Sequence, residues 1–345
     1  MSSAPPPFVS VIMPIRNEAG FIAHSLDQIL AQDYPGDRFE IIVADGMSDD
    51  NTRAVLAEYS QKYPSIRVVD NPARITPAGL NVCIDHARGD LILRIDGHSE
   101  VATDFVSQSV RLLEEHPEAW SAGGPIVHAG RNRFGEAVAI AMSHPCGVGM
   151  ATHRFPNYEG YVEGAQFPIF RRWIFERIGK FDERLIRNQD DELNYRITQA
   201  GGKIFVSPRV RYVYYVRGRI GQLFRQYFQY SFWRIPVIRK HNKPTTPRQM
   251  VPPLFFLTMF ALAIAGIWLR QPWVALALPA IYASALALTA VSVIPRKGLA
   301  VACLLPVALA TMHIAYALGM MYGLWALMFQ PKAWDQRGSM AALTR

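Results

Sequence analysis

The sequence predicts an α/β fold with a mostly parallel, nucleotide-binding type of sheet, followed by C-terminal transmembrane helices. Three observations lead to this fold class. Up to about residue 245, short apolar runs alternate with helical patterns, which is typical of parallel sheets with crossover helices. Two of the apolar runs end in acidic residues. From Met250 to Phe329 the chain is almost wholly apolar, with charges only at Arg270, Arg296 and Lys297.

The elements of the α/β part follow one another as alternating strands and helices. The predicted strands cover residues 8–15, 39–45, 66–69 and 90–100, and the predicted helices cover 18–33, 52–63 and 77–87. The strand segments are short, apolar and rich in β-branched residues, and the first helix segment has apolar residues at helical spacing. This βαβαβ order predicts a parallel sheet whose ligands lie beyond the carboxyl ends of its strands.

Asp45 ends the apolar run IIVA in the stretch IIVADGMSDDNTRAV. An acid at this point faces a ligand crevice in an open α/β sheet, and its carboxylate accepts hydrogen bonds from a base or a ribose. Asp49 and Asp50 have a second interpretation, because either residue suits the N-cap of the helix that is predicted from Thr52. The residues alone leave both alternatives open.

A second strand ends at Asp96-Gly97-His98. Either the carboxylate and the imidazole reach one divalent cation that phosphate oxygens also hold, or the three residues form only a polar turn.

The apolar C-terminal part divides at its charged residues into stretches of about 250–269, 273–294 and 299–329. Each stretch can cross about 30 Å of hydrocarbon as a helix. The alternative is a buried soluble domain, but three successive segments of this length rarely lack charges in water. A re-entrant or interfacial third segment also stays open, because three crossings would place the basic tail (330–345, with Lys332, Arg337 and Arg345) outside the cell.

Charge patterning predicts a multi-pass protein of the cytoplasmic (inner) membrane whose α/β domain faces the cytoplasm. Residues 1–7 are expected to be disordered. A cleavable signal peptide is not expected, because the N-terminus has no basic segment followed by an apolar stretch. The net charge of +8 favours anionic membrane lipids as partners over nucleic acid, for which the sequence has no motif. Basic residues precede the first apolar stretch at Arg234, Arg239, Lys240, Lys243 and Arg248.

Four segments carry a family resemblance. They are VSVIMPIRNEAGFIAHSL, VADGMSDDNT, NPARITPAGLNVCIDHARGDLILRIDGH and GKFDERLIRNQDDELNYRITQAGGKIF. In this order they resemble the motifs of inverting glycosyltransferases of family 2, and within it the membrane-attached, ExoA-like branch of succinoglycan-biosynthesis glucosyltransferases. The similarity covers about residues 8 to 235. It implies a GT-A glycosyltransferase domain over 8–220 and an interfacial helix with a basic linker over 221–249, before the membrane helices of 250–329.

The resemblance also implies a site for a UDP-sugar. In the family, the residue that matches Asp45 binds the uracil or ribose side of the donor, next to a Pro-x-x-Asn-Glu loop. Arg74 and Asn81 would lie near the same pocket, with a surface charge and a helix cap as their alternatives. The implied nucleotide contacts are Pro14, Arg16, Asn17, Glu18, Asp45, Arg74, Asn81 and Asp96.

The cation site departs from the usual family pattern. Most members carry Asp-x-Asp where this chain has Asp96-Gly97-His98, and the ExoA-like branch accepts His in the third place. The resemblance implies that Asp96 and His98 bind Mg²⁺ or Mn²⁺, because neutral imidazole is a good ligand for Mn²⁺. A hydrogen bond from His98 to a phosphate is the alternative.

The segment NQDDELNYR matches the family pattern Glu-Asp-x-Asp-Leu-x-x-Arg, with Gln189 in place of the first Glu. The match aligns Asp190 with the family's base, and Asp191 is the fallback. An inverting transfer needs one carboxylate to take the proton of the acceptor hydroxyl while that oxygen attacks the anomeric carbon. Alternatively, the acids are favoured only by the dipole at a helix N-terminus.

Membrane members of the family often carry Gln-x-x-Arg-Trp before the first span. This chain has Gln229, Trp233 and then Arg234, so the arginine is displaced. The match implies that these three residues contact the acceptor or the diphosphate, with membrane anchoring as the alternative.

These features predict transfer of a hexose, glucose above all, from a UDP-sugar to a polyprenyl-diphosphate-linked saccharide in exopolysaccharide biosynthesis. Two alternatives remain: a processive polysaccharide synthase, and a catalytically silent membrane scaffold that binds nucleotide-sugars.

Overall fold

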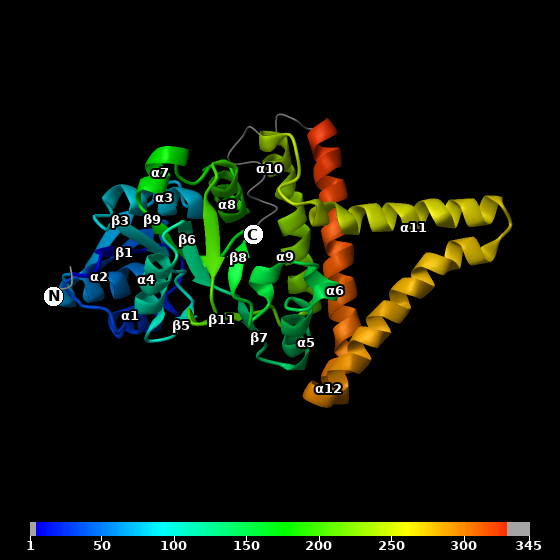
Figure 1. The fold of residues 1–345 in the computed structure, drawn as a ribbon, viewed down its shortest axis with the longest axis horizontal. Helices are drawn as coiled ribbons and strands as arrows, with labels where there is room; N and C mark the ends of the chain where they lie inside the picture. The colour runs from blue at the N-terminus through cyan, green and yellow to red at the C-terminus, as the bar shows by residue number, and fades with distance from the viewer. Residues whose placement is uncertain (1–4, 330–345) are drawn as a thin grey trace. The chain divides into compact units, whose positions relative to one another are not determined.

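The computed structural model describes residues 5–329. The predicted basic tail (330–345) and the first four residues of the predicted disordered N-terminus lie outside the described residues. The described part forms two compact units (Figure 1). The N-terminal unit combines the described residues up to Val127 with Thr152–Tyr214, and the C-terminal unit combines His128–Ala151 with the described residues from Tyr215 onward.

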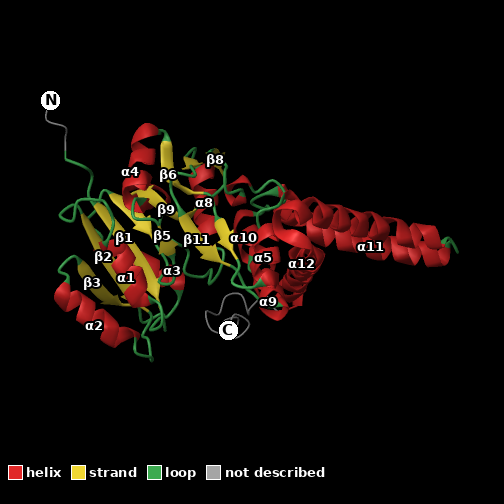
Figure 2. Ribbon diagram, turned by 90° about the horizontal axis from the view of Figure 1, so that it is seen from below, coloured by secondary structure: helices red, strands yellow, loops and turns green. Residues whose placement is uncertain are grey.

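An eight-stranded sheet forms the centre of the N-terminal unit (Figure 2). Its strands are β1 (Val9–Ile15), β2 (Phe39–Asp45), β3 (Ile66–Asp70), β4 (Leu91–Arg94), β6 (Ala119–Gly124), β8 (Gly160–Val162), β9 (Gln166–Arg171) and β10 (Lys203–Val206). The strand order is β3-β2-β1-β4-β9-β6-β10-β8. The pairs β1–β2, β1–β4, β2–β3 and β6–β10 are parallel, whereas β9 runs antiparallel to β4 and β6. The predicted mostly parallel α/β fold is confirmed.

Helices cover both faces of this sheet. They are α1 (Ile22–Leu30), α2 (Thr52–Lys62), α3 (Thr76–His86), α4 (Phe105–Glu115), α7 (Trp173–Ile178) and α8 (Gln189–Gln199), with a short 3-10 helix η1 (Thr152–Arg154). Successive strand residues point to opposite faces. On β1, Val11 and Met13 join an apolar cluster with α1, α2 and α4, whereas Ile12 joins a second cluster with α3, α7 and α8.

The predicted elements of the first half are all present, but two of them are shorter than predicted. The strand expected over 90–100 ends at Arg94, so that Asp96 lies in a turn, and a separate short strand β5 (Glu100–Val101) pairs with β11 (Tyr212–Tyr215). Helix α1 begins at Ile22, because a turn precedes it in which the amides of Phe21 and Ile22 both donate to the carbonyl of Glu18 at 2.9 Å. Strand β7 (Val127–Ala129) spans the boundary between the units in the sequence.

The C-terminal unit is helical. Its elements are α5 (Arg133–Ala141), α6 (Pro145–Val148), α9 (Ile220–Phe232), α10 (Arg234–His241), η2 (Pro247–Met250), α11 (Val251–Trp268) and α12 (Pro272–Phe329). Residues 128–151 lie within the sequence range predicted for the GT-A domain, yet they cluster with these helices. The reason is close packing of α6 on α12, where a Cβ added to Gly147 would lie 3.0 Å from Cδ2 of Leu309.

By length and composition, α11 and α12 are the two helices among the described residues that could cross a membrane. Helix α12 has 58 residues, about 87 Å at 1.5 Å per residue, which is far longer than the hydrocarbon core of about 30 Å. Gly298 interrupts α12 with a φ of 77°, a conformation that glycine adopts without strain. The parts before and after Gly298 correspond to the second and third predicted stretches, and Figure 1 shows the chain reversing between them.

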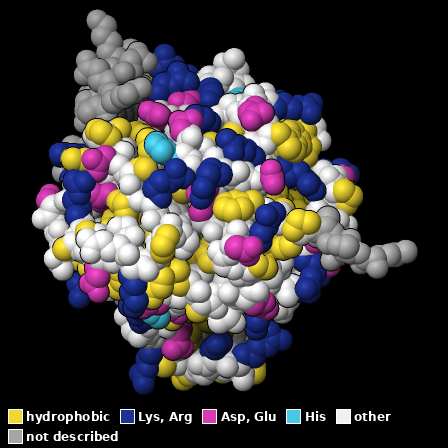
Figure 3. Space-filling view, turned by 90° about the vertical axis from the view of Figure 1, so that its left-hand side faces the viewer, with side chains coloured by type: hydrophobic (Ala, Val, Ile, Leu, Met, Phe, Trp, Pro, Cys, Tyr) yellow, Lys and Arg dark blue, Asp and Glu magenta, His cyan; other side chains and the backbone are white. Residues whose placement is uncertain are grey.

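Apolar side chains on these helices are strongly exposed. The exposed fractions of Ile267, Trp268 and Leu288 are 78%, 82% and 70%, whereas the face drawn in Figure 3 carries charged side chains of both signs. Exposed apolar surface of this extent indicates membrane association.

Glu40 at the start of β2 gives a prediction for stability. Its buried carboxylate accepts hydrogen bonds from Ser10 Oγ at 2.7 Å and from the amide of Arg88 at 2.8 Å, and it pairs with Arg67 at 3.0 Å. Burial raises the pKa of Glu40, but these hydrogen bonds and Arg88 outweigh burial and hold the pKa below its ordinary value of 4.5. Glu40→Gln should therefore cost about 1–3 kcal/mol at neutral pH.

The sign of the pH dependence follows from the lowered pKa. The contribution of Glu40 is complete above the unfolded-state pKa and disappears as the pH falls through the folded-state pKa. Unfolding of the detergent-solubilised protein at pH 7 and pH 3 measures this effect, with the exposed Glu58→Gln as control. A difference between wild type and Glu40→Gln that is as large at pH 3 as at pH 7 would contradict the assignment.

Candidate functional site

The loops that follow β1 and β2 are joined by hydrogen bonds between Asn17, a predicted nucleotide-binding residue, and Asp49. Asn17 lies in the left-handed region, with a φ of 56°. Its side-chain amide donates to Asp49 Oδ1 at 2.7 Å, and its side-chain oxygen accepts from the amide of Asp49 at 3.1 Å. Pro14 belongs to β1 and pairs in register with Ala44. The two loops therefore form one rigid edge at the carboxyl end of the parallel strands.

Asp45 is completely buried beneath this edge. Its carboxylate accepts from Ser48 Oγ at 2.5 Å and from the amide of Ser48, and it lies 3.3 Å from Arg53 Nε. Asp45 thus holds the loop after β2 in shape, and its predicted contact with a base or ribose stays a prediction. Asp50, not Asp49, accepts from the first amide of α2, that of Thr52, at 2.9 Å. Hydrogen bonds from the side chain and the amide of Thr52 lower the pKa of Asp50.

The Asp96-Gly97-His98 segment forms a tight turn against the same edge. The amide of Ser99 donates to the carbonyl of Asp96 at 3.3 Å, and Ser25 Oγ donates to the carbonyl of Gly97 at 2.8 Å. A Cβ at position 97 would lie 2.7 Å from Cγ2 of Ile15. Only glycine fits this close approach, so Gly97 sets the position of both predicted cation ligands.

His98 faces Glu18, a residue of the predicted nucleotide loop. Its Nδ1 lies 3.0 Å from Glu18 Oε1, and its side chain is 54% exposed. A carboxylate that holds one ring nitrogen is the usual partner of a metal-ligating histidine. Among the described residues no cluster of three or more His, Cys, Asp or Glu side chains could hold a metal ion. Cation binding by Asp96 and His98 therefore stays a prediction.

Arg94, at the end of β4, connects the turn to α8. Its Nε and Nη2 lie 3.2 and 3.1 Å from Asp96 Oδ1, and its Nη1 lies 3.8 Å from Asp190 Oδ2. The side chain of Arg94 is only 9% exposed. Burial lowers the pKa of Arg94, but Asp96 and Asp190 outweigh burial and raise it above its ordinary value. The guanidinium is therefore a fixed positive charge between two carboxylates from distant motifs.

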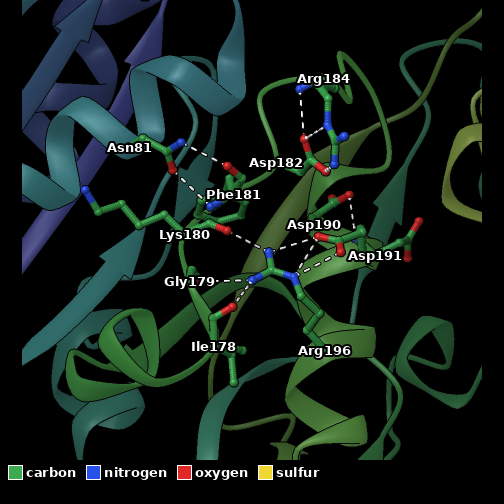
Figure 4. Close-up of polar contacts among 11 residues, drawn as sticks. Asn81, Ile178, Gly179, Lys180, Phe181, Asp182, Arg184, Asp190, Asp191 and Arg196 are labelled. Carbon is green, nitrogen blue, oxygen red and sulfur yellow. Dashed lines mark hydrogen bonds and ion pairs between the residues drawn. The ribbon is translucent and has the colours of Figure 1, made fainter. Parts of the chain in front are cut away.

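Helix α8 carries the predicted base. Figure 4 shows the hydrogen bonds that hold the segment before α8 against this helix. The guanidinium of Arg196 donates to the carbonyls of Ile178, Gly179 and Lys180 at 2.5, 2.9 and 2.6 Å. It also pairs with the fully buried Glu192 at 2.9 Å. This arrangement caps the end of α7 and fixes the loop that leads into Asp190.

Asn81, on α3, forms hydrogen bonds with the same loop (Figure 4). Its amide donates to the carbonyl of Phe181 at 2.9 Å and to Glu183 Oε1 at 3.1 Å, and its oxygen accepts from the amide of Phe181 at 3.0 Å. Both ends of the Asn81 amide therefore bind protein, and a nucleotide contact stays a prediction. Arg74 is exposed in the loop before α3, with a φ of 58°, and its nucleotide contact also stays a prediction.

Asp190, the predicted base, is the second residue of α8. Asp190 faces Arg94. Figure 4 shows the hydrogen bond that Asp190 Oδ1 accepts from the amide of Asp191 at 2.9 Å. The side chain of Asp190 is 42% exposed. The structure thus brings Asp190 and Asp96 to one site.

The predicted acceptor residues belong to the C-terminal unit. Gln229 and Trp233 are only 5% and 3% exposed, and Arg234, at the start of α10, is half-buried. The α9 helix that carries Gln229 packs on α12, where a Cβ at Gly319 would lie 2.2 Å from the carbonyl of Phe228. Their contacts with an acceptor or diphosphate remain predictions.

Sequence reasoning missed Arg94, Glu192 and Arg196. A signal for Arg94 was present, because a charged residue in a buried strand two positions before Asp96 points to the same side of the sheet. Glu192 and Arg196 also had a signal, since their i, i+4 spacing places them on one helix face.

Gly97→Ala gives a prediction about the turn. The added Cβ must displace Ile15 or the turn itself, so we expect a loss of about 1–3 kcal/mol in stability and weaker cation-dependent nucleotide binding. Titration calorimetry with UDP and Mn²⁺ measures the binding. Gly36→Ala is the matched control, because nothing lies within 4 Å of a Cβ there. Equal nucleotide affinity in Gly97→Ala and Gly36→Ala would show that the close packing of this turn is irrelevant to binding.

Comparisons with known proteins bear on the family and the fold. The model of the family "Glycosyl transferase family 2" matches residues 10–178. The succinoglycan biosynthesis protein ExoA of Rhizobium meliloti (strain 1021) is 29% identical over 273 residues, which cover 75% of this chain and 81% of that protein. A dolichyl N-acetyl-alpha-D-glucosaminyl phosphate glucuronosyltransferase of Methanococcus voltae, whose sugar is a diacetamido-dideoxy derivative, is 27% identical over 68% of this chain and 74% of that protein.

Solved structures support the fold. The mannosyltransferase PcManGT from Pyrobaculum calidifontis, in complex with GDP-Man and Mn²⁺, superposes with a TM-score of 0.60 at 21% identity and covers 94% of this chain and 90% of its own. Residues 1–349 of S. aureus TarS, in complex with UDP, give a TM-score of 0.50 at 16% identity, with 92% of each chain covered. With the motif matches and the GT-A-like sheet, these findings show that residues 10–178 are a glycosyl transferase family 2 domain.

Proposed function

We propose that the protein transfers a hexose, glucose above all, from a UDP-sugar to a polyprenyl-diphosphate-linked saccharide during exopolysaccharide assembly. The similarity to ExoA, a succinoglycan biosynthesis protein, supports the pathway. The similarity to a transferase that acts on a dolichyl phosphate sugar supports a polyprenyl-linked acceptor. UDP in the TarS complex supports the donor class.

One observation carries the proposal: the carboxylates of Asp96 and Asp190 both form ion pairs with the guanidinium of Arg94. A strand-end carboxylate suited to a donor diphosphate with its cation, and a half-exposed carboxylate suited to an acceptor hydroxyl, therefore share one site. This is the arrangement that a direct displacement at a sugar carbon requires.

In the proposed reaction, Asp190 accepts the proton of the acceptor hydroxyl. The hydroxyl oxygen forms a bond to the anomeric carbon from the face opposite UDP. The bond between that carbon and the diphosphate oxygen breaks, its electron pair leaves with UDP, and the anomeric configuration is inverted.

The residues present fit a divalent cation that arrives with the diphosphate. Mg²⁺ is commonly held by one or two carboxylates together with substrate phosphates, and two protein ligands, Asp96 and His98, suit this mode better than a closed protein cage. The contact of His98 with Glu18 supplies the orienting carboxylate. The Mn²⁺ in the PcManGT complex supports a divalent cation in this fold. The bound cation would neutralise charge on the departing diphosphate.

We place the site on the cytoplasmic side of the membrane. Basic residues that precede α11, namely Arg239, Lys240, Lys243 and Arg248, favour this orientation and contact with anionic lipid headgroups. The second and third apolar stretches, on either side of Gly298 in α12, would provide two further crossings, or one crossing with a re-entrant segment.

Release of UDP from UDP-glucose by the purified protein in lipid nanodiscs tests this function. We expect release that requires Mg²⁺ or Mn²⁺ and rises when a polyprenyl-diphosphate saccharide is added. A panel of nucleotide-sugars identifies the donor, and a gel separates single transfer from polymerisation. If every donor in the panel binds and none is turned over, the protein is a scaffold and the proposal fails.

A further inference from the structure

Arg94 is the residue that the proposed chemistry leaves without a role, although it lies at the centre of the site. It is 7% exposed and ends β4 between the buried residues Leu93 and Ile95. Burying a guanidinium is costly unless it is paired. A purely structural role would be met by any carboxylate or by backbone carbonyls, as at Arg171, which donates to the carbonyls of Ala119 and Leu113 at 3.0 and 2.8 Å. Arg94 instead meets two partly exposed carboxylates.

The geometry divides the guanidinium between these carboxylates. Nε and Nη2 face Asp96, whereas Nη1 faces Asp190. The three nitrogen atoms are fixed in one plane, so the position of one carboxylate determines the direction in which the other is held. A lysine ammonium at this point is a single charge and lacks this fork.

Two carboxylates next to one divalent cation create a conflict of roles. Asp96 is proposed to hold the cation, but an ionised Asp190 close by is also a good cation ligand, since hard cations prefer carboxylate oxygens. A carboxylate that is bound to a cation is a poor base, because its lone pairs are engaged. The site therefore needs an interaction that keeps the Asp190 carboxylate directed at the acceptor.

We infer that Arg94 is a positioning residue that keeps Asp190 available as a base and prevents it from becoming a third cation ligand. The inference rests on the proposed function and deepens it, since it explains how one acidic site holds a cation ligand and a base side by side. It also predicts that kcat and cation affinity change in opposite directions: removal of Arg94 should slow the reaction and strengthen cation binding.

Arg94→Met tests this inference in the full-length protein. Methionine fills much of the buried volume without a charge, and the exposed fractions of 23% and 42% for the Asp96 and Asp190 side chains let water solvate both carboxylates. We expect kcat to fall by about 10- to 100-fold, the scale of a misplaced catalytic group. We expect the affinity for Mn²⁺, measured at saturating UDP from the paramagnetic resonance signal of unbound Mn²⁺, to rise by about threefold or more.

A second variant assigns that rise to Asp190. In Arg94→Met/Asp190→Asn the gain in Mn²⁺ affinity should disappear, because the amide is a much weaker ligand than the carboxylate. Arg94→Lys should retain the fold and the charge but recover only part of kcat. Arg171→Met is the control for a half-buried arginine outside the site, and it should lower thermal stability without a change in Mn²⁺ affinity.

The possible outcomes are distinct. Wild-type kcat and Mn²⁺ affinity in Arg94→Met would overturn the inference and leave the proposed function intact. A parallel fall of kcat, Mn²⁺ affinity and thermal stability would mean that Arg94 only supports the fold, which also overturns it. If wild type itself binds no Mn²⁺ in the presence of UDP, the cation site of the proposed function is what fails.

Discussion

Asp190→Asn should lower turnover by about 10² to 10⁴-fold, the usual contribution of general-base catalysis. The amide keeps the shape of the side chain but cannot accept the proton of the acceptor hydroxyl. The Asp190 side chain is 42% exposed, so we expect the variant to fold. Donor affinity should barely change, because the proposed donor contacts lie elsewhere. Steady-state UDP release and calorimetric UDP binding, made on the same preparation, measure both quantities.

Two comparisons make this prediction specific. Asp191→Asn alters the neighbouring acid, and Asp37→Asn alters an exposed acid far from α8 in the sequence. If the acids at the start of α8 serve only the helix dipole, Asp190→Asn costs about 0.3–1 kcal/mol of stability and leaves turnover nearly intact. A large loss confined to Asp191→Asn would move the base by one residue.

Asp96→Ala should abolish cation-dependent UDP binding, because the diphosphate loses the cation that neutralises its charge. His98→Asp restores the Asp-x-Asp pattern of most family members, so it should retain activity and shift the preference from Mn²⁺ towards Mg²⁺, which favours oxygen ligands. Calorimetry with UDP and each cation distinguishes the variants. Cation-dependent binding that is unchanged in Asp96→Ala would remove the cation assignment.

Periodicity and strand-end chemistry are sufficient to predict the strands and helices of residues 8–100. The strand predicted over 39–45 is present as β2 (Phe39–Asp45). A short, β-branched apolar run between polar segments is typical of a buried strand in a parallel sheet. The strand at 90–100 was predicted too long, since the sequence does not reveal that the chain turns after Arg94 to pack Gly97 on Ile15. That turn is a tertiary effect.

The site was harder to predict than the fold. The sequence shows the acids at the strand ends, but it does not show what each carboxylate contacts. The carboxylate of Asp45, for example, accepts a hydrogen bond from Ser48 and forms an ion pair with Arg53. Likewise, the assignment of 128–151 to the C-terminal unit depends on packing against a helix far along the chain. Local pattern carries no information on contacts of this range.

The central claim is that one edge of the sheet holds a cation ligand and a base with separate tasks. Its most direct test is the measurement of UDP affinity with Mn²⁺ and of kcat, side by side, on Asp96→Ala and Asp190→Asn. We predict that Asp96→Ala loses cation-dependent affinity, whereas Asp190→Asn keeps that affinity and loses about 10² to 10⁴-fold in kcat. Wild-type affinity in Asp96→Ala together with wild-type kcat in Asp190→Asn would contradict the account.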